Sequence, residues 1–161
     1  MNITQILVPL DGSALAEAAL VPALELARKH GARLLLVRAA EAHTLPLADP
    51  IDAQVAAVRD AEQYLAGARD QVRRAGVVDV DVSVWYGAPA QAIVEAAKYR
   101  KADLIVMSSH GRSGVGRLVL GSVAEKVLRS TAVPILLLRP GAAPLDTSFE
   151  GAPAAKEVTH G

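Results

Sequence analysis

Five short apolar segments alternate with longer amphipathic segments, and this alternation constrains the fold more than any other feature of the chain. The apolar segments are residues 6–8, 34–37, 80–85, 104–107 and 135–138. Strands that alternate with helical patterns are typical of a βαβ series with a parallel sheet. Each intervening segment is long enough for a right-handed crossover. We therefore predict one α/β domain over residues 1–140, built on an open five-stranded parallel sheet with helices on both faces.

The first helical segment lies between the first two apolar segments. Ser13 is placed to cap its start and Gly31 to end it, and Pro22 predicts a kink inside it. Its predicted buried face consists of Leu15, Ala19, Pro22, Ala23 and Leu26. Before the second helix, residues 42–50 contain two prolines and no steady period, which predicts a loop that could lie over a ligand.

The second helical segment has the strongest periodicity and ends at Gly76. Its apolar residues recur at steps of three and four, at Val58, Ala61, Leu65, Ala68, Val72 and Ala75. Two shorter helices follow, and their apolar residues are Ile93, Ala96 and Ala97 in one and Val123, Val127 and Leu128 in the other. The last helix is expected to end before Pro134.

The third and fifth strands are predicted to lie at the two edges of the sheet. Val80, Val82 and Val84 alternate with polar residues, as expected where a strand meets water. Ile135–Leu138 is apolar throughout, and an exposed apolar edge pairs with another chain. We therefore predict a homodimer joined through Ile135–Leu138. The alternative is that the C-terminal tail, residues 141–161, covers this strand, although its composition predicts a flexible segment.

Composition excludes several classes of function. The 17 basic residues balance 17 acidic ones, and aromatic residues make up only 3%, which argues against a nucleic-acid partner. There is no cysteine, so thiol catalysis and zinc–cysteine sites are excluded, and the scattered histidines indicate no metal site. No apolar run is long enough to span a bilayer. We expect a cytoplasmic protein with no membrane partner.

Residues 108–122 have the composition of a loop that holds phosphate. They follow the fourth apolar segment, carry four glycines and lead directly into a helical pattern at Gly121 and Ser122. Backbone N–H groups and the positive end of a helix dipole bind anions at such a place. Residues 9–13 leave the first strand in the same way, and a strand order of 3-2-1-4-5 places the two loops on either side of one crevice.

Three stretches resemble the universal stress protein family, and together they extend the resemblance over residues 2–139. They are V-P-L-D-G-S at 8–13, S-S-H-G-R-S-G-V-G-R-L-V-L-G-S at 108–122 and V-P-I-L-L-L at 133–138. The nucleotide-binding members follow the pattern of Gly, two residues, Gly, nine residues, then Gly with Ser or Thr. Here Gly111, Gly121 and Ser122 match, whereas Ser108 replaces the first glycine.

The resemblance implies a Rossmann-like fold and a dimeric stress-response switch that binds ATP, alone or with Mg²⁺, and signals to an unknown protein partner. It implies that Asp11 meets the ribose or adenine, that Pro9 and the backbone of Ala39 border the base, and that Ser108 lies near the ribose. The groups implied to hold phosphate are Gly111, Gly121, Ser122 and the N–H of Val123, with charge added by Arg112 and Arg117. No residue is predicted to be catalytic, and at most slow ATP hydrolysis or autophosphorylation on a serine such as Ser122 is implied.

Other interpretations of these residues remain open. Asp11 is also typical of a turn that caps a helix, Ser122 of a helix cap, and Arg112 of a solvated loop charge. His110 has no recognisable nucleophile or carboxylate partner, which favours a structural role. A P-loop ATPase would need a lysine directly after Gly121, and none stands there; a dinucleotide-dependent oxidoreductase would need a glycine triplet after the first strand. A nucleotide-free interaction protein of the same fold is the third class, and Ser108 is the argument for it.

Overall fold

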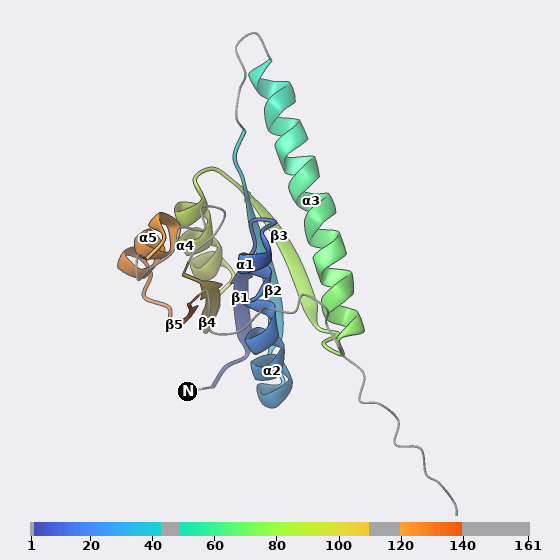
Figure 1. Cartoon of the computed structure of the whole chain (residues 1–161), viewed down its shortest axis with the longest axis vertical. Coiled ribbons are helices and arrows are strands. Elements are labelled where there is room, and N and C mark those ends of the chain that lie inside the picture. The colour runs from blue at the N-terminus through green and yellow to red at the C-terminus, as the bar shows by residue number, and fades with distance from the viewer. Residues whose placement is uncertain (1, 43–48, 110–119, 140–161) are drawn as a thin grey trace, which may run out of the picture.

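The computed structural model describes residues 2–42, 49–109 and 120–139, which form one parallel sheet flanked by helices (Figure 1). In chain order the elements are β1 (Gln5–Pro9), α1 (Ala14–Glu17), α2 (Leu20–His30), β2 (Arg33–Ala40), α3 (Pro50–Arg74), β3 (Val80–Tyr86), α4 (Pro89–Tyr99), β4 (Leu104–Ser108), α5 (Ser122–Ser130) and β5 (Ile135–Leu138). Every pairing is parallel and the strand order is β3-β2-β1-β4-β5. The predicted fold class and strand order are confirmed.

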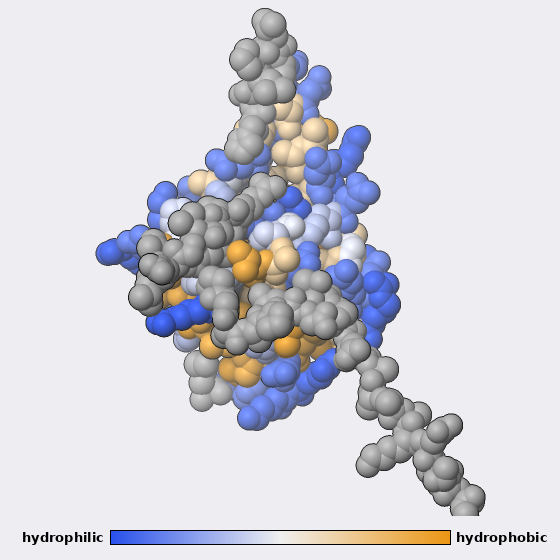
Figure 2. All heavy atoms as spheres, in the orientation of Figure 1, coloured by the Kyte–Doolittle hydropathy of each residue, from blue (hydrophilic) through white to orange (hydrophobic). Residues whose placement is uncertain are grey.

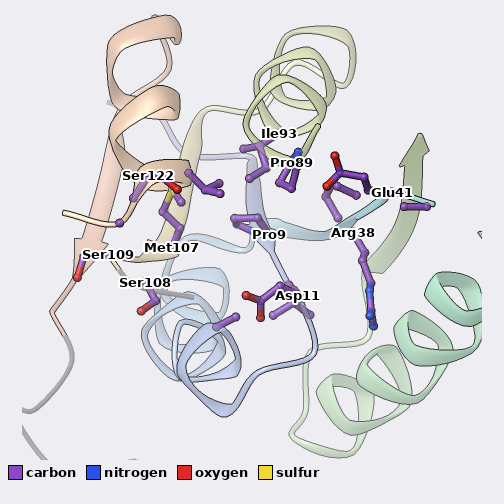
Figure 3. A pocket seen from close by; sticks show the side chains of 18 of the residues that line it. Pro9, Asp11, Arg38, Glu41, Pro89, Ile93, Met107, Ser108, Ser109 and Ser122 are labelled. Atoms are coloured by element: carbon purple, nitrogen blue, oxygen red, sulfur yellow. The ribbon is translucent and has the colours of Figure 1, made fainter. Parts of the chain in front are cut away.

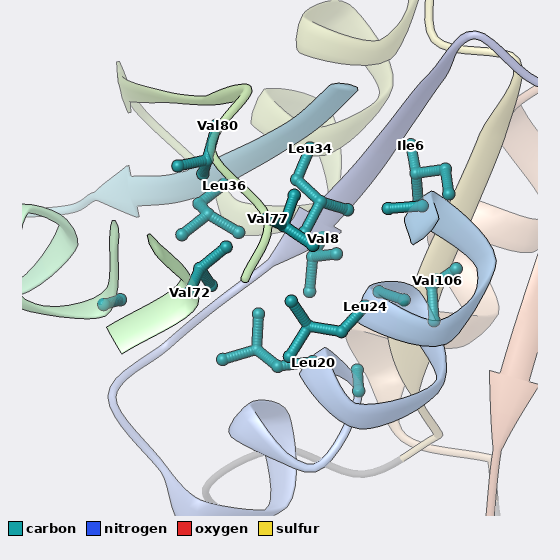
Figure 4. Close-up of a cluster of buried hydrophobic side chains, with 14 of the residues drawn as sticks. Ile6, Val8, Leu20, Leu24, Leu34, Leu36, Val72, Val77, Val80 and Val106 are labelled. Atoms are coloured by element: carbon teal, nitrogen blue, oxygen red, sulfur yellow. The ribbon is translucent and has the colours of Figure 1, made fainter. Parts of the chain in front are cut away.

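The core consists of two apolar layers, one on each face of the sheet. Ile6 and Val8 of β1 face α2 and α3, whereas Leu7 between them faces α4 and α5. Figure 4 shows the first layer, in which Leu20 and Leu24 of α2 lie opposite strand side chains. Because the central strands are covered on both sides, their sequences are continuously apolar rather than alternating. Each fully buried Leu or Ile contributes about 1.5–3 kcal/mol to stability.

The first helical segment forms two helices instead of one kinked helix. The break lies at Ala18 and Ala19, four residues before Pro22. Pro22 has no N–H to donate to the Ala18 carbonyl, and its ring would clash with that oxygen in a continuous helix. Ala19 and Ala23 of the predicted face are fully buried. The other members of that face, Leu15, Pro22 and Leu26, are only half-buried, because the buried face of α2 consists of Leu20, Ala23, Leu24 and Ala27.

The ends of this helical region agree with the predicted caps. The Ser13 hydroxyl oxygen accepts a hydrogen bond from the Ala16 N–H at 3.1 Å. Gly31 adopts a left-handed conformation with φ of 65°, which favours glycine because it has no β-carbon. Both signals were local in the sequence, and both are confirmed.

The long helix α3 begins earlier than expected. Pro50, assigned to the loop, is its first residue, and the Asp49 carboxylate caps the helix by accepting from the Ile51 N–H at 2.8 Å. The predicted face is buried from Ala61 to Ala75, but Val58 is only half-buried because the first turns of α3 extend beyond the sheet (Figure 1). Residues 43–48 of the preceding loop lie outside the described part of the chain.

The two shorter helices follow their predictions with one exception. In α4 the predicted face of Ile93, Ala96 and Ala97 is buried. In α5 the prediction for Leu128 was wrong, because Leu128 is 52% exposed while Ala124 and Val127 are buried. The helix is only nine residues long, so several faces of its sequence are compatible with burial. The face is decided by the packing of α5 against the sheet and α4.

The sheet edges are β3 and β5, as predicted. On β5, Leu136 is the most exposed residue, at 37%. Residues 141–161, the alternative cover for this strand, lie outside the described residues.

Candidate functional site

A pocket of about 440 Å³ opens at the carboxyl ends of the central strands. It lies where β1 and β4 are neighbours and their connections leave in opposite directions, which is the usual ligand position in an open parallel sheet. Its lining residues come from the ends of β1, β2 and β4, from the turn after β1, from α1, from the first two turns of α4, from the start of α5 and from one face of α3. They are Pro9, Leu10, Asp11, Ala16, Val37, Arg38, Ala39, Ala40, Glu41, Ala57, Asp60, Pro89, Ile93, Met107, Ser108, Ser109, Gly121, Ser122, Val123 and Ala124.

Most of the residues singled out in the sequence lie together in this pocket. Those that line it are Pro9, Asp11, Ala39, Ser108, Gly121, Ser122 and Val123. Figure 3 shows Pro9 in the middle of the group, with Ser108 and Ser122 on the α5 side and Arg38 and Glu41 on the opposite side. Gly111 and Arg112, together with Arg117 and His110, lie outside the described residues, so their roles stay predictions.

The loop after β1 is a turn held by its own side chains. The Asp11 Oδ1 accepts a hydrogen bond from the Ser13 N–H at 2.8 Å, and Ser13 in turn caps α1. Gly12 between them has a φ of 85°, a conformation that favours glycine. Asp11 therefore stabilises the turn, which is the alternative to a binding role, and its side chain also lines the pocket. The two roles are compatible in this geometry.

The first turn of α5 presents backbone N–H groups to the pocket. Gly121, not Ser122, is the N-cap, and no side chain caps the helix at that position. The first intrahelical donor is Glu125, whose N–H reaches the Gly121 carbonyl at 2.9 Å. The N–H groups of the lining residues Ser122, Val123 and Ala124 therefore precede the first intrahelical bond. This is the arrangement at which helix termini hold anions.

Two backbone hydrogen bonds connect this helix start to the sheet edge. The Gly121 N–H donates to the Ser109 carbonyl at 2.8 Å, and the Ser109 N–H donates to the Leu138 carbonyl at 2.7 Å. Ser109 therefore links the beginning of α5 to the end of β5. Neither bond has a signal in the sequence, because the residues that each one joins are separated by a loop or a helix.

The opposite wall contains charged residues that sequence reasoning missed. Arg38 interrupts the apolar sequence of β2, and its guanidinium lies 4.5 Å from the centre of the Tyr64 ring. The Tyr64 hydroxyl donates a hydrogen bond to the Glu17 Oε1 at 2.7 Å. Burial, together with Glu17, raises the pKa of the Tyr64 hydroxyl above its usual value, so Tyr64 remains a donor at neutral pH. The sequence signal for this wall was Arg38 itself, a charged residue directly after the apolar segment 34–37.

The pocket is electrically polarised from one wall to the other. Asp11, Glu41 and Asp60 place three carboxylates on the β1, β2 and α3 side, where they outnumber the single guanidinium of Arg38. The α5 side has serine hydroxyls and helix N–H groups at the positive end of the helix dipole. The arrangement suits a ligand with hydrogen-bond donors at one end and negative charge at the other.

The described ranges 2–42, 49–109 and 120–139 contain neither a cluster of metal-ligating residues nor a membrane-spanning helix. No group of three or more His, Cys, Asp or Glu is arranged there to hold a metal ion. None of the helices described is long and apolar enough to cross a membrane.

Residues 2–139 match the model of the universal stress protein family. The chain belongs to this family. The universal stress protein of Thermus aquaticus described from the 3′ region of QAH/OAS sulfhydrylase is 40% identical over 136 residues, covering 83% of this chain and 97% of the relative. The prediction of the family from three short motifs is therefore confirmed.

Solved structures of universal stress proteins have the same fold. UspA from Lactobacillus plantarum is 26% identical, with a TM-score of 0.74 over 86% of this chain and 99% of its own. A universal stress protein solved in complex with cAMP is also 26% identical, with a TM-score of 0.67 over 86% of this chain and 98% of its own. At least one protein of similar sequence and fold therefore binds an adenine nucleotide.

Proposed function

We propose that this universal stress protein binds an adenine nucleotide, with ATP as the ligand, in the pocket between the β1 turn and the start of α5. The observation that carries the proposal is the first turn of α5, where the N–H groups of Ser122 to Ala124 border the pocket opposite a carboxylate-rich wall. The similar protein in complex with cAMP supports an adenine nucleotide as the class of ligand.

The polarity of the pocket supports one orientation of the nucleotide. Phosphates bind at the α5 wall, because helix N–H groups and serine hydroxyls stabilise negative charge there. The ribose hydroxyls and the adenine amino group are hydrogen-bond donors and face the carboxylates, with Asp11 as the ribose partner. Pro9 and Ala39 border the base. The volume of about 440 Å³ lies in the usual range of roughly 300–1,000 Å³ for small-molecule sites.

The proposal includes a dimer and a nucleotide-dependent change. Gly121 borders the phosphate side of the pocket and is two hydrogen bonds from Leu138, the last residue of the β5 edge. A phosphate that fixes the start of α5 therefore also acts on the strand through which the homodimer is proposed to form. In the proposed switch, a protein partner distinguishes the occupied dimer from the empty one, and the stress response is the process that uses this difference.

The test is to identify and measure the bound nucleotide. Mass spectrometry of freshly purified protein, first native and then denatured, reports any ligand that co-purifies. Calorimetric titration of stripped protein with ATP, AMP, cAMP and GTP then gives affinities. We expect ATP to bind and Gly121→Val to reduce its affinity about a hundredfold, because a branched side chain would displace phosphate from the start of α5.

Gly67→Ala is the matched control for the loss of ATP affinity in Gly121→Val. Gly67→Ala adds a methyl group in α3 at a point with no atom within 4 Å, outside the pocket lining, and should leave the ATP affinity unchanged. Absence of both co-purified nucleotide and ATP binding would refute the proposal. It would favour the nucleotide-free interaction protein, for which Ser108 in place of the glycine of the family pattern is the specific observation.

The proposed nucleotide site also allows slow ATP hydrolysis or autophosphorylation to be tested. The lining holds the Ser122 hydroxyl at the phosphate wall, which makes it the candidate acceptor for slow autophosphorylation. Release of phosphate and mass gain on Ser122 can be followed in the same samples. We expect turnover to be slow or absent.

A further inference from the structure

Four residues at and behind the carboxylate-rich wall form a closed ring of contacts, which we call the clasp: Gly12, Glu17, Tyr64 and Arg38. The Glu17 carboxylate accepts from the Tyr64 hydroxyl at 2.7 Å, and the Tyr64 ring lies under the Arg38 guanidinium at 4.5 Å. The guanidinium also lies close to Gly12, where an added β-carbon would be 3.4 Å from Arg38 Nη1. The chain from Gly12 through α1 to Glu17 closes the ring.

The clasp joins three parts of the fold that are separated along the chain. Gly12 and Glu17 belong to the β1 turn and α1, Arg38 to β2, and Tyr64 to the middle of α3. The helix α1 is only four residues long and is separated from α2 by the break at Ala18 and Ala19. A helix of one turn has little stability of its own, so its position depends on contacts of this kind.

The clasp adjoins the pocket on both sides. Arg38 itself lines the pocket, and Asp11 is the residue before Gly12. On α3, Ala57 and Asp60 line the pocket and precede Tyr64 by seven and four residues, so the three side chains lie along one face of the helix. Tyr64 is not part of the lining, although it holds together the elements that supply it.

We propose that the clasp positions the ribose and base side of the pocket, so that Tyr64 controls nucleotide affinity by fixing the Asp11 turn against α3. Tyr64 and Glu17 are positioning residues that act through Asp11 and the α3 face. A cation–π contact between a guanidinium and an aromatic ring and a hydrogen bond to a carboxylate both depend on geometry, which suits them to fix a position. The inference rests on the proposed nucleotide site, but the clasp itself can be tested in the ligand-free protein.

The first experiment uses Tyr64→Phe and needs no ligand. The variant keeps the ring under Arg38 and removes only the hydroxyl that reaches Glu17. Hydrogen exchange of the α1 amides should become about tenfold faster, because α1 loses a hydrogen bond to a charged group. Tyr99→Phe is the matched control, since Tyr99 is 77% exposed and lies at the end of α4. Unchanged exchange in Tyr64→Phe would overturn the proposal.

The second experiment measures binding by the variant. Tyr64→Phe should weaken ATP about fivefold and leave inorganic tripolyphosphate unaffected, because only the ribose and base side is displaced. In the Asp11→Asn background the same substitution should have a much smaller effect, which a general loss of stability would not produce. Equal weakening of ATP and tripolyphosphate, or full additivity with Asp11→Asn, would contradict the proposal. If wild-type protein binds no ATP, the proposed function fails while the exchange result still decides whether the clasp holds α1.

A second pair of variants covers the case in which Tyr64→Phe does not fold. Glu17→Ala removes the acceptor, whereas Glu17→Gln retains an oxygen at the same position. Glu17→Ala should reproduce the faster exchange, and Glu17→Gln should restore most of the protection. If neither Glu17 variant exchanges faster than the wild-type protein, the hydrogen bond does not position α1.

Discussion

The Asp103 carboxylate, directly before β4, holds the start of β1 through one of its two oxygens. Its Oδ2 accepts hydrogen bonds from the Thr4 hydroxyl at 2.7 Å, the Thr4 N–H at 2.8 Å and the Gln5 N–H at 3.0 Å. The Thr4 hydroxyl and these two backbone donors hold the pKa of Asp103 below its usual value. Because all three donors stabilise the charged carboxylate, the folded protein binds a proton there less readily than the unfolded chain does.

We predict that this carboxylate contributes to the pH dependence of stability. A lowered folded pKa gives stabilisation that is complete above the unfolded value of about 3.9 and is lost as the pH falls through the folded value. Asp103→Asn should therefore lower the free energy of unfolding at pH 7 by at most about 1 kcal/mol, because solvent screens this partly exposed carboxylate, and it should flatten the decline of that free energy in acid. Urea unfolding from pH 7 to pH 3 measures both effects.

The control for this prediction is Asp70→Asn on the surface of α3. Asp70 has a side chain that is 53% exposed and a distant ionic contact of 3.6 Å to Arg69. Its replacement should change the unfolding free energy little at any pH. Parallel pH profiles for wild-type protein and Asp103→Asn would contradict the assignment.

Contacts of this kind explain why the residue scale was the hardest to predict. Asp103 and Thr4 are 99 residues apart, and Tyr64 and Glu17 are 47 apart. Periodicity and turn chemistry describe only neighbours along the chain, so they indicate that a residue is polar without naming its partner. By contrast, Ser13 and Gly31 act on their own helices, and both were predicted from position alone.

At the scale of elements, length and local chemistry decided which predictions succeeded. The helix α3 has a long apolar repeat and a glycine stop, and its core-facing residues were found correctly from Ala61 onward. The short helix α5 offered too few turns, so Leu128 was assigned to the wrong face. The α1–α2 break follows from the clash between Pro22 and the Ala18 carbonyl, yet the sequence alone located only the proline.

Gly67 offers a test of helix propensity inside α3. It lies in the exposed middle of the helix, and a β-carbon there would meet no atom within 4 Å. Gly67→Ala should raise the free energy of unfolding by about 1 kcal/mol, because alanine loses less backbone entropy in a helix. The corresponding rise in Tm is about 2–4 °C, measurable by thermal unfolding followed by circular dichroism.

Gly76 provides the opposite case on the same helix. It ends α3 with φ of 92°, and a β-carbon there would lie 3.6 Å from the Arg28 guanidinium. Gly76→Ala should destabilise the protein, because the left-handed conformation strains any side chain. Equal changes in stability for the two substitutions would refute this account of both glycines.

At the scale of the whole molecule, hydrophilic and apolar surfaces lie at different places around the sheet. Figure 2 shows hydrophilic residues at the lower end of the visible face, where α2 ends in Arg28, Lys29 and His30. The β5 edge instead exposes Leu136. Strand patterns were sufficient to predict both edges. The location of the pocket followed from the order 3-2-1-4-5, which the spacing of the apolar segments alone could not prove.

The predicted homodimer can be tested at the β5 edge. The chain mass is 16.8 kDa, and light scattering after gel filtration should give twice that value. Leu136→Lys should shift the protein to the monomer, because a charge would enter the proposed apolar interface. Val78→Lys, at a residue 77% exposed next to the opposite edge, should leave the dimer intact. A monomeric wild-type protein, or a dimer broken only by Val78→Lys, would exclude the β5 interface.

The strand order also has a consequence for how the protein is made. β1 pairs with β2 through Ile6 and Leu34, and on its other side with β4 through Ile6 and Leu104. A nascent chain that has left the ribosome only as far as α4 can assemble β1, β2 and β3, but the apolar strand β1 then remains an open edge. Translation through β4 is therefore the step that closes the centre of the sheet, and a pause before Leu104 would prolong the interval in which β1 can pair with another chain.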